Sequence, residues 1–155
     1  MDILRRYRAS DFEVLYEIDR ECFPKGIAYG RAELKIYLGL AGAHCLLAEI
    51  KNEIAGFILT DRSGELGHVI TLDVLEAYRR KRIASLLLGA AENHAASHGV
   101  SRMCLETATT NKPAIAFWRA HGYREIGTAK NYYGRGLDAF VMDKKLGDAT
   151  ELAPG

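Results

Sequence analysis

The chain has 155 residues, a length typical of one domain with a substantial interior. Its 21 Lys and Arg balance 20 Asp and Glu to a formal net charge of +1, which argues against nonspecific nucleic-acid binding, since that needs a broad basic surface. A membrane-spanning helix needs about 18 apolar residues in succession, and no run reaches that length. With no apolar signal segment among the first residues, the sequence predicts a cytoplasmic protein with no membrane partner.

Cysteine and histidine residues give no sign of a disulfide framework or a metal centre. The three cysteines, Cys22, Cys45 and Cys104, are far apart, and none belongs to a Cys-x-x-Cys pair. The histidines show no ligand spacing, and each is expected to be structural or exposed. We therefore expect free thiols in a reducing compartment and no bound metal.

The first forty residues predict one strand and two helices. Residues 2–8 favour a strand, and the Ser-Asp-Phe-Glu segment 10–13 has the spacing of a capping box at the start of a helix. Apolar residues then recur at helical spacing, at Phe12, Leu15, Ile18 and Cys22. A proline and a glycine within residues 23–26 end that helix, and a short second helix is expected at 31–39.

The middle of the chain predicts a hairpin, a further strand and a long helix. Apolar runs at residues 44–50 and 54–61 flank a polar turn, and a strand follows at 67–74. The helix is expected to bury a stripe that steps by three and four residues, at Ile83, Leu86, Leu87, Ala90, Ala91 and His94. His94 is expected to be a partly buried structural residue, and Gly99 to end the helix.

The last third predicts a strand, a helix and two more strands. Residues 102–107 favour a strand, and a helix follows at 111–121 with Asn111 as its cap. The final strands are expected at 123–129 and 138–146, and residues 147–155 are expected to be disordered.

Together these elements predict a single α/β domain at residues 1–146, with four helices and a mixed sheet of about seven strands, not a doubly wound sheet. The strands at 44–50, 54–61 and 67–74 are expected to be antiparallel neighbours. The strand–helix–strand unit at 67–107 should form a right-handed parallel crossover.

A basic turn joins the strand and the helix of this unit. The first backbone N–H groups of such a helix lack partners, and the helix dipole favours negative charge there. Cationic side chains gather at the same end, at Arg79, Arg80, Lys81 and Arg82. We therefore expect a phosphate-bearing ligand at this turn. The alternative is an ordinary crossover unit with a solvated basic turn.

Three segments, in order and with matching spacing, resemble the GNAT N-acetyltransferase superfamily, and the resemblance covers residues 1–146. Residues 73–84 resemble its acetyl-CoA motif, an Arg or Gln followed by x-x-Gly-x-Gly/Ala. Residues 105–123 are similar to the strand and helix that complete the cofactor slot. The Lys-Asn-Tyr-Tyr run at 130–133, followed by Asp138-Ala139, is similar to the terminal hairpin of N-terminal acetyltransferases. Within the superfamily, the chain most resembles ribosomal-protein alanine N-acetyltransferases and archaeal and eukaryotic N-terminal acetyltransferases.

The resemblance implies that acetyl-CoA binds between splayed strands at 67–74 and 101–107. Backbone groups of Leu72, Asp73 and Val74 would pair with its pantetheine arm, and amides of the turn would hold its pyrophosphate. The residues implied at the turn are Arg79, Arg80, Lys81, Arg82, Ile83, Ala84 and Ser85. Further cofactor positions are Asn111, for which a role as helix cap alone is the alternative, and Trp118.

Arg82 departs from the family pattern, which usually has glycine at this position. Glycine lets a ligand approach the backbone closely. Because a residue in the first helical turn has ordinary dihedral angles, we expect Arg82 to cause no backbone strain. Its guanidinium would reach a phosphate, or its bulk would weaken binding.

The resemblance also assigns the chemistry. Glu106 matches the general base of the alanine N-acetyltransferases, with an exposed strand glutamate as the alternative reading. Trp118 stands where the family usually has a tyrosine acid, and an indole N–H is no practical acid at neutral pH; Trp118 is otherwise a core residue. Tyr133, Tyr132 or a water is therefore expected to supply the leaving-group proton.

Acceptor choice follows from the acidity of amines. An α-amine has a pKa of about 7.7–8.0 and a lysine one of about 10.4, so deprotonating lysine costs roughly 3 kcal/mol more at neutral pH. One carboxylate base suits the α-amine better. The Lys-Asn-Tyr-Tyr loop and the loop at 23–24 match segments that flank a peptide N-terminus in relatives. The resemblance therefore implies that the peptide contacts Phe23, Pro24, Tyr29, Tyr132 and Tyr133, with neutral surface tyrosines as the alternative.

The sequence thus predicts an acetyl-CoA-dependent N-acetyltransferase that acts on a protein or peptide N-terminus by direct transfer in a ternary complex, as a monomer or homodimer. Two alternatives stay open. One is acetylation of a small-molecule amine or a lysine, and the other is a noncatalytic acyl-CoA-binding regulatory module.

Overall fold

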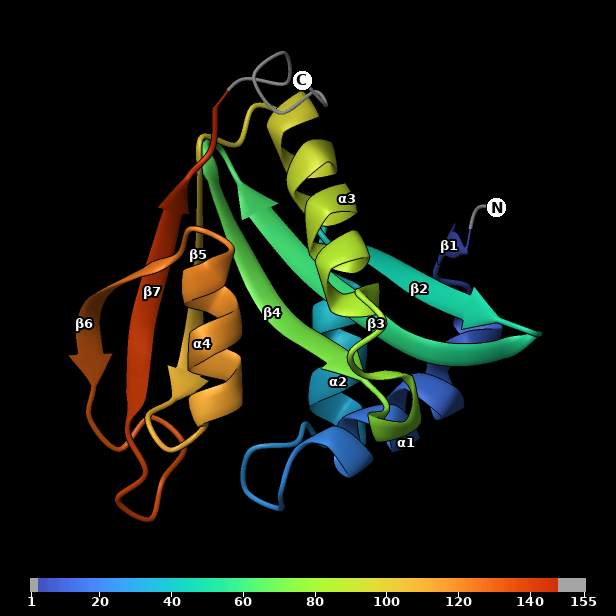
Figure 1. The fold of residues 1–155 in the computed structure, drawn as a ribbon, viewed down its shortest axis with the longest axis horizontal. Coiled ribbons are helices and arrows are strands. Elements are labelled where there is room, and N and C mark those ends of the chain that lie inside the picture. Colours follow the sequence, from blue (N-terminus) through green and yellow to red (C-terminus); the bar gives the residue numbers. More distant parts are fainter. Residues whose placement is uncertain (1–2, 148–155) are drawn as a thin grey trace.

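The computed structural model describes residues 3–147, which form a seven-stranded mixed sheet with helices on both faces (Figure 1). The strand order is β1-β2-β3-β4-β5-β7-β6. The strands are β1 (Leu4–Arg6), β2 (His44–Ile50), β3 (Glu53–Ser63), β4 (Leu66–Val74), β5 (Arg102–Ala108), β6 (Arg124–Ala129) and β7 (Ala139–Lys145). All neighbours are antiparallel except β4 and β5, which are parallel, so the predicted hairpin and crossover are confirmed.

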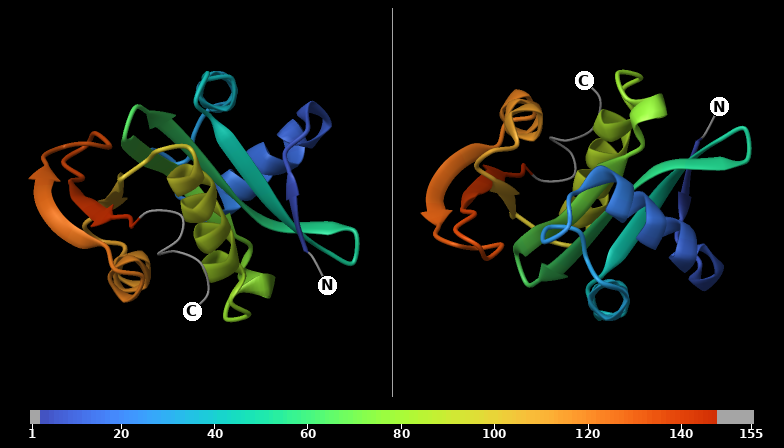
Figure 2. Two further views of the ribbon diagram at one scale, coloured as in Figure 1. Left: turned by 90° about the horizontal axis from the view of Figure 1, so that it is seen from above. Right: turned by 90° about the horizontal axis from the view of Figure 1, so that it is seen from below.

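Four α-helices cover the sheet, as predicted: α1 (Phe12–Cys22), α2 (Arg31–Leu38), α3 (Ile83–Ser97) and α4 (Lys112–Ala120). Figure 2 shows α3 and α4 on one face and α1 and α2 on the other. Each face has its own apolar core, with Leu87 and Met103 fully buried under α3, and Leu15 and Phe57 fully buried under α1. Gly99 follows α3 at φ +89°, and it ends the helix as predicted.

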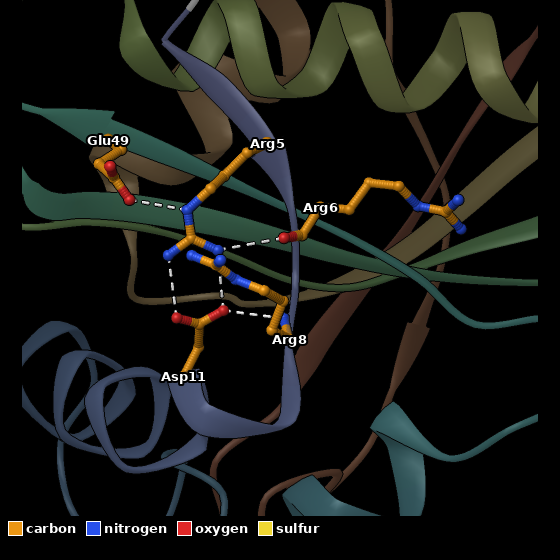
Figure 3. A network of polar contacts seen from close by, with 5 residues as sticks. All are labelled: Arg5, Arg6, Arg8, Asp11 and Glu49. Carbon is orange, nitrogen blue, oxygen red and sulfur yellow. Dashed lines mark hydrogen bonds and ion pairs between the residues drawn. The ribbon is translucent and has the colours of Figure 1, made fainter.

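The start of α1 differs from the predicted capping box. A 3-10 turn, Ala9–Asp11, precedes the helix, and Ser10 makes no capping hydrogen bond. The Asp11 carboxylate instead accepts a 2.8 Å hydrogen bond from the backbone N–H of Arg8 and two from the guanidinium of Arg5 (Figure 3). Arg5 also donates to Glu49 at 2.7 Å, and its hydrogen bonds lower the pKa of Asp11. This network fastens the entry of α1 to β1 and β2.

The buried face of α3 is rotated from the predicted stripe. The stripe is buried at Ile83, Leu87 and Ala91. Leu86, however, is 49% exposed, so this part of the prediction was wrong. The face is extended by three other buried residues, Leu88, Glu92 and Ala95. Three consecutive leucines leave the phase of the helix open, and the hydrogen bond from the Tyr123 hydroxyl to the buried Glu92, at 2.8 Å, turns this side inward.

Strands β4 and β5 pair only at their beginnings and then diverge (Figure 1). Leu66, Gly67 and His68 lie opposite Arg102, Met103 and Cys104, respectively. Beyond these three pairs, β4 and β5 do not pair with each other. The register of β3 against β4 shifts in the same region, between Leu59 and Thr60. Such a bulge bends its strand and redirects side chains. The sheet therefore opens into a wedge below His68.

Candidate active site

A groove of about 1010 Å³ lies in this wedge, between β4, the start of α3, and α4. Most of the predicted cofactor residues line it: Leu72, Val74, Arg79, Arg80, Arg82, Ile83, Ala84, Ser85, Asn111 and Trp118. Two do not. Lys81 lies outside the lining and has its ammonium 5.7 Å from the centre of the Tyr78 ring, and the side chain of Asp73 is buried on the opposite face of β4.

Backbone N–H groups at the start of α3 form an anion site. None of the six N–H groups from Arg80 to Ser85 donates a hydrogen bond to a group of the described residues 3–147, whereas the next one, from Leu86, donates to the carbonyl of Arg82 at 3.0 Å. Three cationic side chains, those of Arg79, Arg80 and Arg82, line the groove around them. Free amides, a helix N-terminus and fixed cations suit the phosphates of coenzyme A.

Arg82 does not have the ordinary helical geometry expected of it. Its φ and ψ are 62° and 16°, which is left-handed, and Arg80 also has a positive φ of 64°. Arg82 precedes the first helical residue instead of belonging to the first turn, which is the reason for the difference. A side chain in this conformation costs roughly 1–2 kcal/mol relative to glycine. The backbone thus keeps the shape that a glycine would adopt freely.

The edge of β4 that faces the groove carries main-chain polar groups. The carbonyl of Ile70 accepts from the Tyr29 hydroxyl at 3.3 Å, and the carbonyl of Val74 accepts from Arg79 Nε at 2.8 Å. Leu72 lies between them, and alternate residues of a strand direct their backbone groups to the same side. Leu72 therefore presents its N–H and C=O to the groove, where an extended ligand arm can pair with them.

A smaller pocket, of about 90 Å³, lies next to the groove. The two share five wall residues, namely Phe23, Leu72, Asn111, Ala114 and Trp118. The pocket is also lined by four predicted residues, Tyr29, Glu106, Tyr132 and Tyr133. Pro24 is not part of its lining, and Ile27 from the same loop takes that place.

Glu106 is held by two hydrogen bonds to one of its oxygens. His68 Nε2 lies 2.7 Å from Glu106 Oε1, and the Tyr132 hydroxyl donates to the same oxygen at 3.2 Å. Burial raises the pKa of Glu106, but the hydrogen bonds from His68 and Tyr132 outweigh it, and the pKa is lower than usual. The carboxylate is thus ionised at neutral pH and able to accept a proton.

Three other predicted site residues, Tyr133, Trp118 and Asn111, differ in their burial and hydrogen bonding. Burial raises the pKa of Tyr133 to about 12, and its hydroxyl makes no hydrogen bond with the described residues. Trp118 is 7% exposed and packs edge to face against Phe117 and Tyr123, so it belongs to the core and also lines both cavities. Asn111 likewise has two roles, because its side chain caps α4 at the N–H of Ala114 and the residue also lines the groove.

Comparison with known proteins identifies the family. The sequence matches the Acetyltransferase (GNAT) family over residues 12–123. The chain belongs to the GNAT acetyltransferases. An N-alpha-acetyltransferase of Saccharolobus solfataricus is 31% identical over 158 residues, which cover 92% of each chain.

Solved structures show the same fold. The crystal structure of Ard1 from Thermoplasma volcanium superposes with a TM-score of 0.86 at 20% identity, covering 94% of this chain and 97% of that one. Arabidopsis thaliana NAA60 in complex with acetyl-CoA has a TM-score of 0.80 at 22% identity, covering 92% and 97%. This GNAT protein is therefore an acetyl-transferring enzyme that uses acetyl-CoA, as predicted. Within residues 3–147, no helix is long and apolar enough to cross a membrane.

His68 is the contact that the sequence did not reveal. It was expected to be structural or exposed like the other histidines, yet it lies against the carboxylate of Glu106. The pairing depends on the parallel register, in which His68 lies opposite Cys104, two residues before Glu106. Register between parallel strands joined by a long crossover cannot be read from one sequence. The predicted disorder of residues 147–155 concerns a segment of which the structure describes only residue 147.

Proposed function

We propose that this enzyme acetylates the N-terminal α-amine of a protein or peptide by direct transfer in a ternary complex. The observation that carries the proposal is the position of Glu106, which lines a pocket that shares five wall residues with the cofactor groove. A base at such a junction serves an amine that arrives from the side opposite the cofactor. The name of the Saccharolobus relative, N-alpha-acetyltransferase, supports this acceptor.

Residues of the groove fit acetyl-CoA and divide its binding among them. The amides of Arg80 to Ser85 suit the pyrophosphate, and the backbone of Leu72 suits the pantetheine arm. Acetyl-CoA supplies the acetyl group as an activated thioester. Asn111 and Trp118 form the wall beside that end of the arm.

Glu106 is the proposed general base, and His68 is the residue that holds it. The amine must lose a proton before it can attack, and a carboxylate with a lowered pKa accepts that proton across the neutral range. His68 and Tyr132 both hold the carboxylate at Oε1, which leaves Oε2 for the amine. Tyr133, whose hydroxyl is not engaged, is the proposed donor to the leaving group.

The strength of this base favours an α-amine over a lysine. At neutral pH an α-amine is about a tenth deprotonated, whereas only about four lysines in ten thousand are deprotonated. One carboxylate is a sufficient base for the α-amine but is too weak a base to suit a lysine. Three tyrosines, Tyr29, Tyr132 and Tyr133, offer flat surfaces for the first residues of a peptide.

The proposal is tested by supplying acetyl-CoA with matched acceptors. One peptide series has a free N-terminus and an internal lysine, a second has the same sequences with a blocked N-terminus, and a third set contains polyamines and aminoglycosides. Mass spectrometry should locate the acetyl group on the α-amine of the first series alone. Acetylation of the blocked peptides or of the small amines would contradict the proposal and assign the acceptor instead.

Glu106→Gln separates an enzyme from a binding module. The variant should lose about a hundred- to ten-thousandfold in kcat. Its affinity for acetyl-CoA should be unchanged, and Trp118, the only tryptophan in the chain, reports that affinity by fluorescence because it lines the groove. A variant with full activity would remove Glu106 from the mechanism.

A further inference from the structure

Buried polar side chains connect β4 to the loop that carries Tyr29. Asp19 on α1 and Asp73 on β4 are 0% and 1% exposed. Neither forms an ion pair with any cation in residues 3–147. Thr71 lies between them, with its Oγ1 at 3.4 Å from Asp19 Oδ1 and 2.5 Å from Asp73 Oδ1. Asp19 Oδ2 accepts a 2.8 Å hydrogen bond from the backbone N–H of Tyr29.

The number of hydrogen-bond donors near each carboxyl group decides which of the two is charged. Thr71 has a single hydroxyl proton, but two carboxyl groups lie within its reach. Asp19 already accepts a main-chain N–H, whereas Asp73 receives none, and its Oδ2 has no partner among the described residues. Two buried carboxylates this close cannot both be ionised cheaply. The proton therefore resides on Asp73, and burial together with Asp19 raises the pKa of Asp73 well above its usual value.

With that proton on Asp73, every donor in the group has an acceptor. The Asp73 carboxyl would then donate to Thr71 Oγ1 across the 2.5 Å contact, which leaves the Thr71 hydroxyl proton for Asp19 Oδ1, while the Tyr29 N–H donates to Asp19 Oδ2. A buried network in which each donor has an acceptor holds its members in place.

The network joins the two substrate sites. Leu72, whose backbone faces the cofactor groove, lies between Thr71 and Asp73 in the strand. Tyr29 lines the small pocket and is fastened to β4 at both ends, by its N–H through Asp19 and by its hydroxyl to the carbonyl of Ile70.

We propose that Asp19, Thr71 and Asp73 are positioning residues for acetyl transfer, forming a hydrogen-bonded chain with one proton on Asp73 that holds Tyr29 against β4 and so shapes the acceptor pocket. The proposal rests on the proposed function for the location of the acceptor but not for its chemical class. Asp19 and Thr71 also line the small pocket. We assign all three to positioning because their side-chain oxygens bond to one another and to the Tyr29 N–H.

Two substitutions of equal size give opposite expectations. Asp73→Asn replaces a carboxyl O–H with an amide N–H that still donates to Thr71, so the chain is kept. Asp19→Asn replaces a carboxylate that accepts two hydrogen bonds with an amide that has one acceptor oxygen. Either the Tyr29 N–H or the Thr71 hydroxyl then faces an NH₂ group.

Steady-state kinetics, with the acceptor that the wild type uses, measures how the two substitutions differ in their effect on the acceptor KM. Asp19→Asn should raise the acceptor KM by about ten- to a hundredfold, the effect of losing a buried hydrogen bond to a charged group. Its affinity for acetyl-CoA should stay within about threefold, and Asp73→Asn should stay within about threefold in both constants. Thr71→Val should behave like Asp19→Asn, and Thr71→Ser should restore the wild-type KM. Should Asp19→Asn fail to fold, the Thr71 pair carries the test.

Amide hydrogen exchange gives a second reading that needs no acceptor. The segment 24–30 should exchange faster in Asp19→Asn than in Asp73→Asn or the wild type. Equal effects of the two asparagine substitutions on KM and on exchange would overturn the proposal, as would a loss confined to acetyl-CoA affinity. Acetylation of lysine instead of an α-amine would refute only the proposed function, because these comparisons hold for any acceptor.

Discussion

The imidazole rings of His44 and His94 lie parallel, with their centres 3.5 Å apart, where β2 packs against α3. His44 is buried, and its Nδ1 has no partner among residues 3–147. Other positive or titratable groups face the pair, namely His98 just after α3, Arg6 on β1 and Arg62 on β3. The arrangement suits neutral imidazoles and opposes their protonation.

This stack should make the fold sensitive to acid. Burial, followed by His94, lowers the pKa of His44 to about 4, whereas in the unfolded chain it is about 6.5. The unfolded state therefore binds the proton more readily, and stability that is present above about pH 6.5 is lost as the pH falls towards about 4. Urea unfolding of the wild type and of His44→Phe at several pH values checks this. The variant, which keeps a ring but cannot titrate, should lose less stability on acidification; an equal loss in both proteins would contradict the prediction.

Arg82→Gly should stabilise the protein by about 1 kcal/mol, because glycine adopts the left-handed conformation of this position without the steric cost of a side chain. Lys81→Gly is the matched control, since it removes the same charge from the same turn, and Lys81 is not among the residues with positive φ. That control should destabilise the protein by roughly 0.5–1 kcal/mol, since it only loosens the unfolded chain. Thermal denaturation ranks the variants. Acetyl-CoA titration of Arg82→Gly shows in addition whether the guanidinium helps binding, and a large gain in affinity would mean that Arg82 impairs the site.

His68→Ala should move the acidic limb of the kcat/KM profile to higher pH. The hydrogen bond from His68 is the largest influence that lowers the pKa of Glu106, so its loss raises that pKa, and the base becomes protonated at a higher pH. Tyr132→Phe should shift the limb in the same direction by less, because its bond is longer, at 3.2 Å against 2.7 Å. An unshifted limb in His68→Ala would show that another group sets it.

Tyr133→Phe should lower kcat by about ten- to a hundredfold, the worth of a hydrogen bond to a charged group. Its pKa of about 12 keeps the phenol protonated throughout the working range, so it acts as a hydrogen-bond donor. Acetyl-CoA affinity serves as the control and should be unchanged. If Tyr133→Phe and Tyr132→Phe both keep full activity, neither hydroxyl donates, and a water takes that role.

The fold was predictable because its signals are local. Strand and helix limits follow from apolar periodicity, and the ends of helices follow from single residues such as Gly99 and Asn111, both confirmed in their places. The cofactor turn was predictable for the same reason, since a strand, a cationic run and a helix are consecutive in the chain. Long-range pairing was less accessible.

What the sequence could not supply depends on register and on competition between partners. His68 meets Glu106 only through the β4–β5 register, and Asp19 meets Thr71 only when α1 packs on β4. Asp11 replaced Ser10 in organising the start of α1 because Arg5, on the neighbouring β1, donates two further hydrogen bonds to its carboxylate. The prediction of ordinary helical geometry for Arg82 was wrong because α3 begins at Ile83, one residue after Arg82.

The short ladder between β4 and β5 has one more consequence. Three residue pairs join the β5–β7–β6 unit to the rest of the sheet, and beyond them no backbone ladder links β4 and β5 within residues 3–147. A ligand arm that paired with the backbone of Leu72 would add a strand beside β4 where the ladder has ended. Its binding would then also strengthen the junction between the two halves of the sheet.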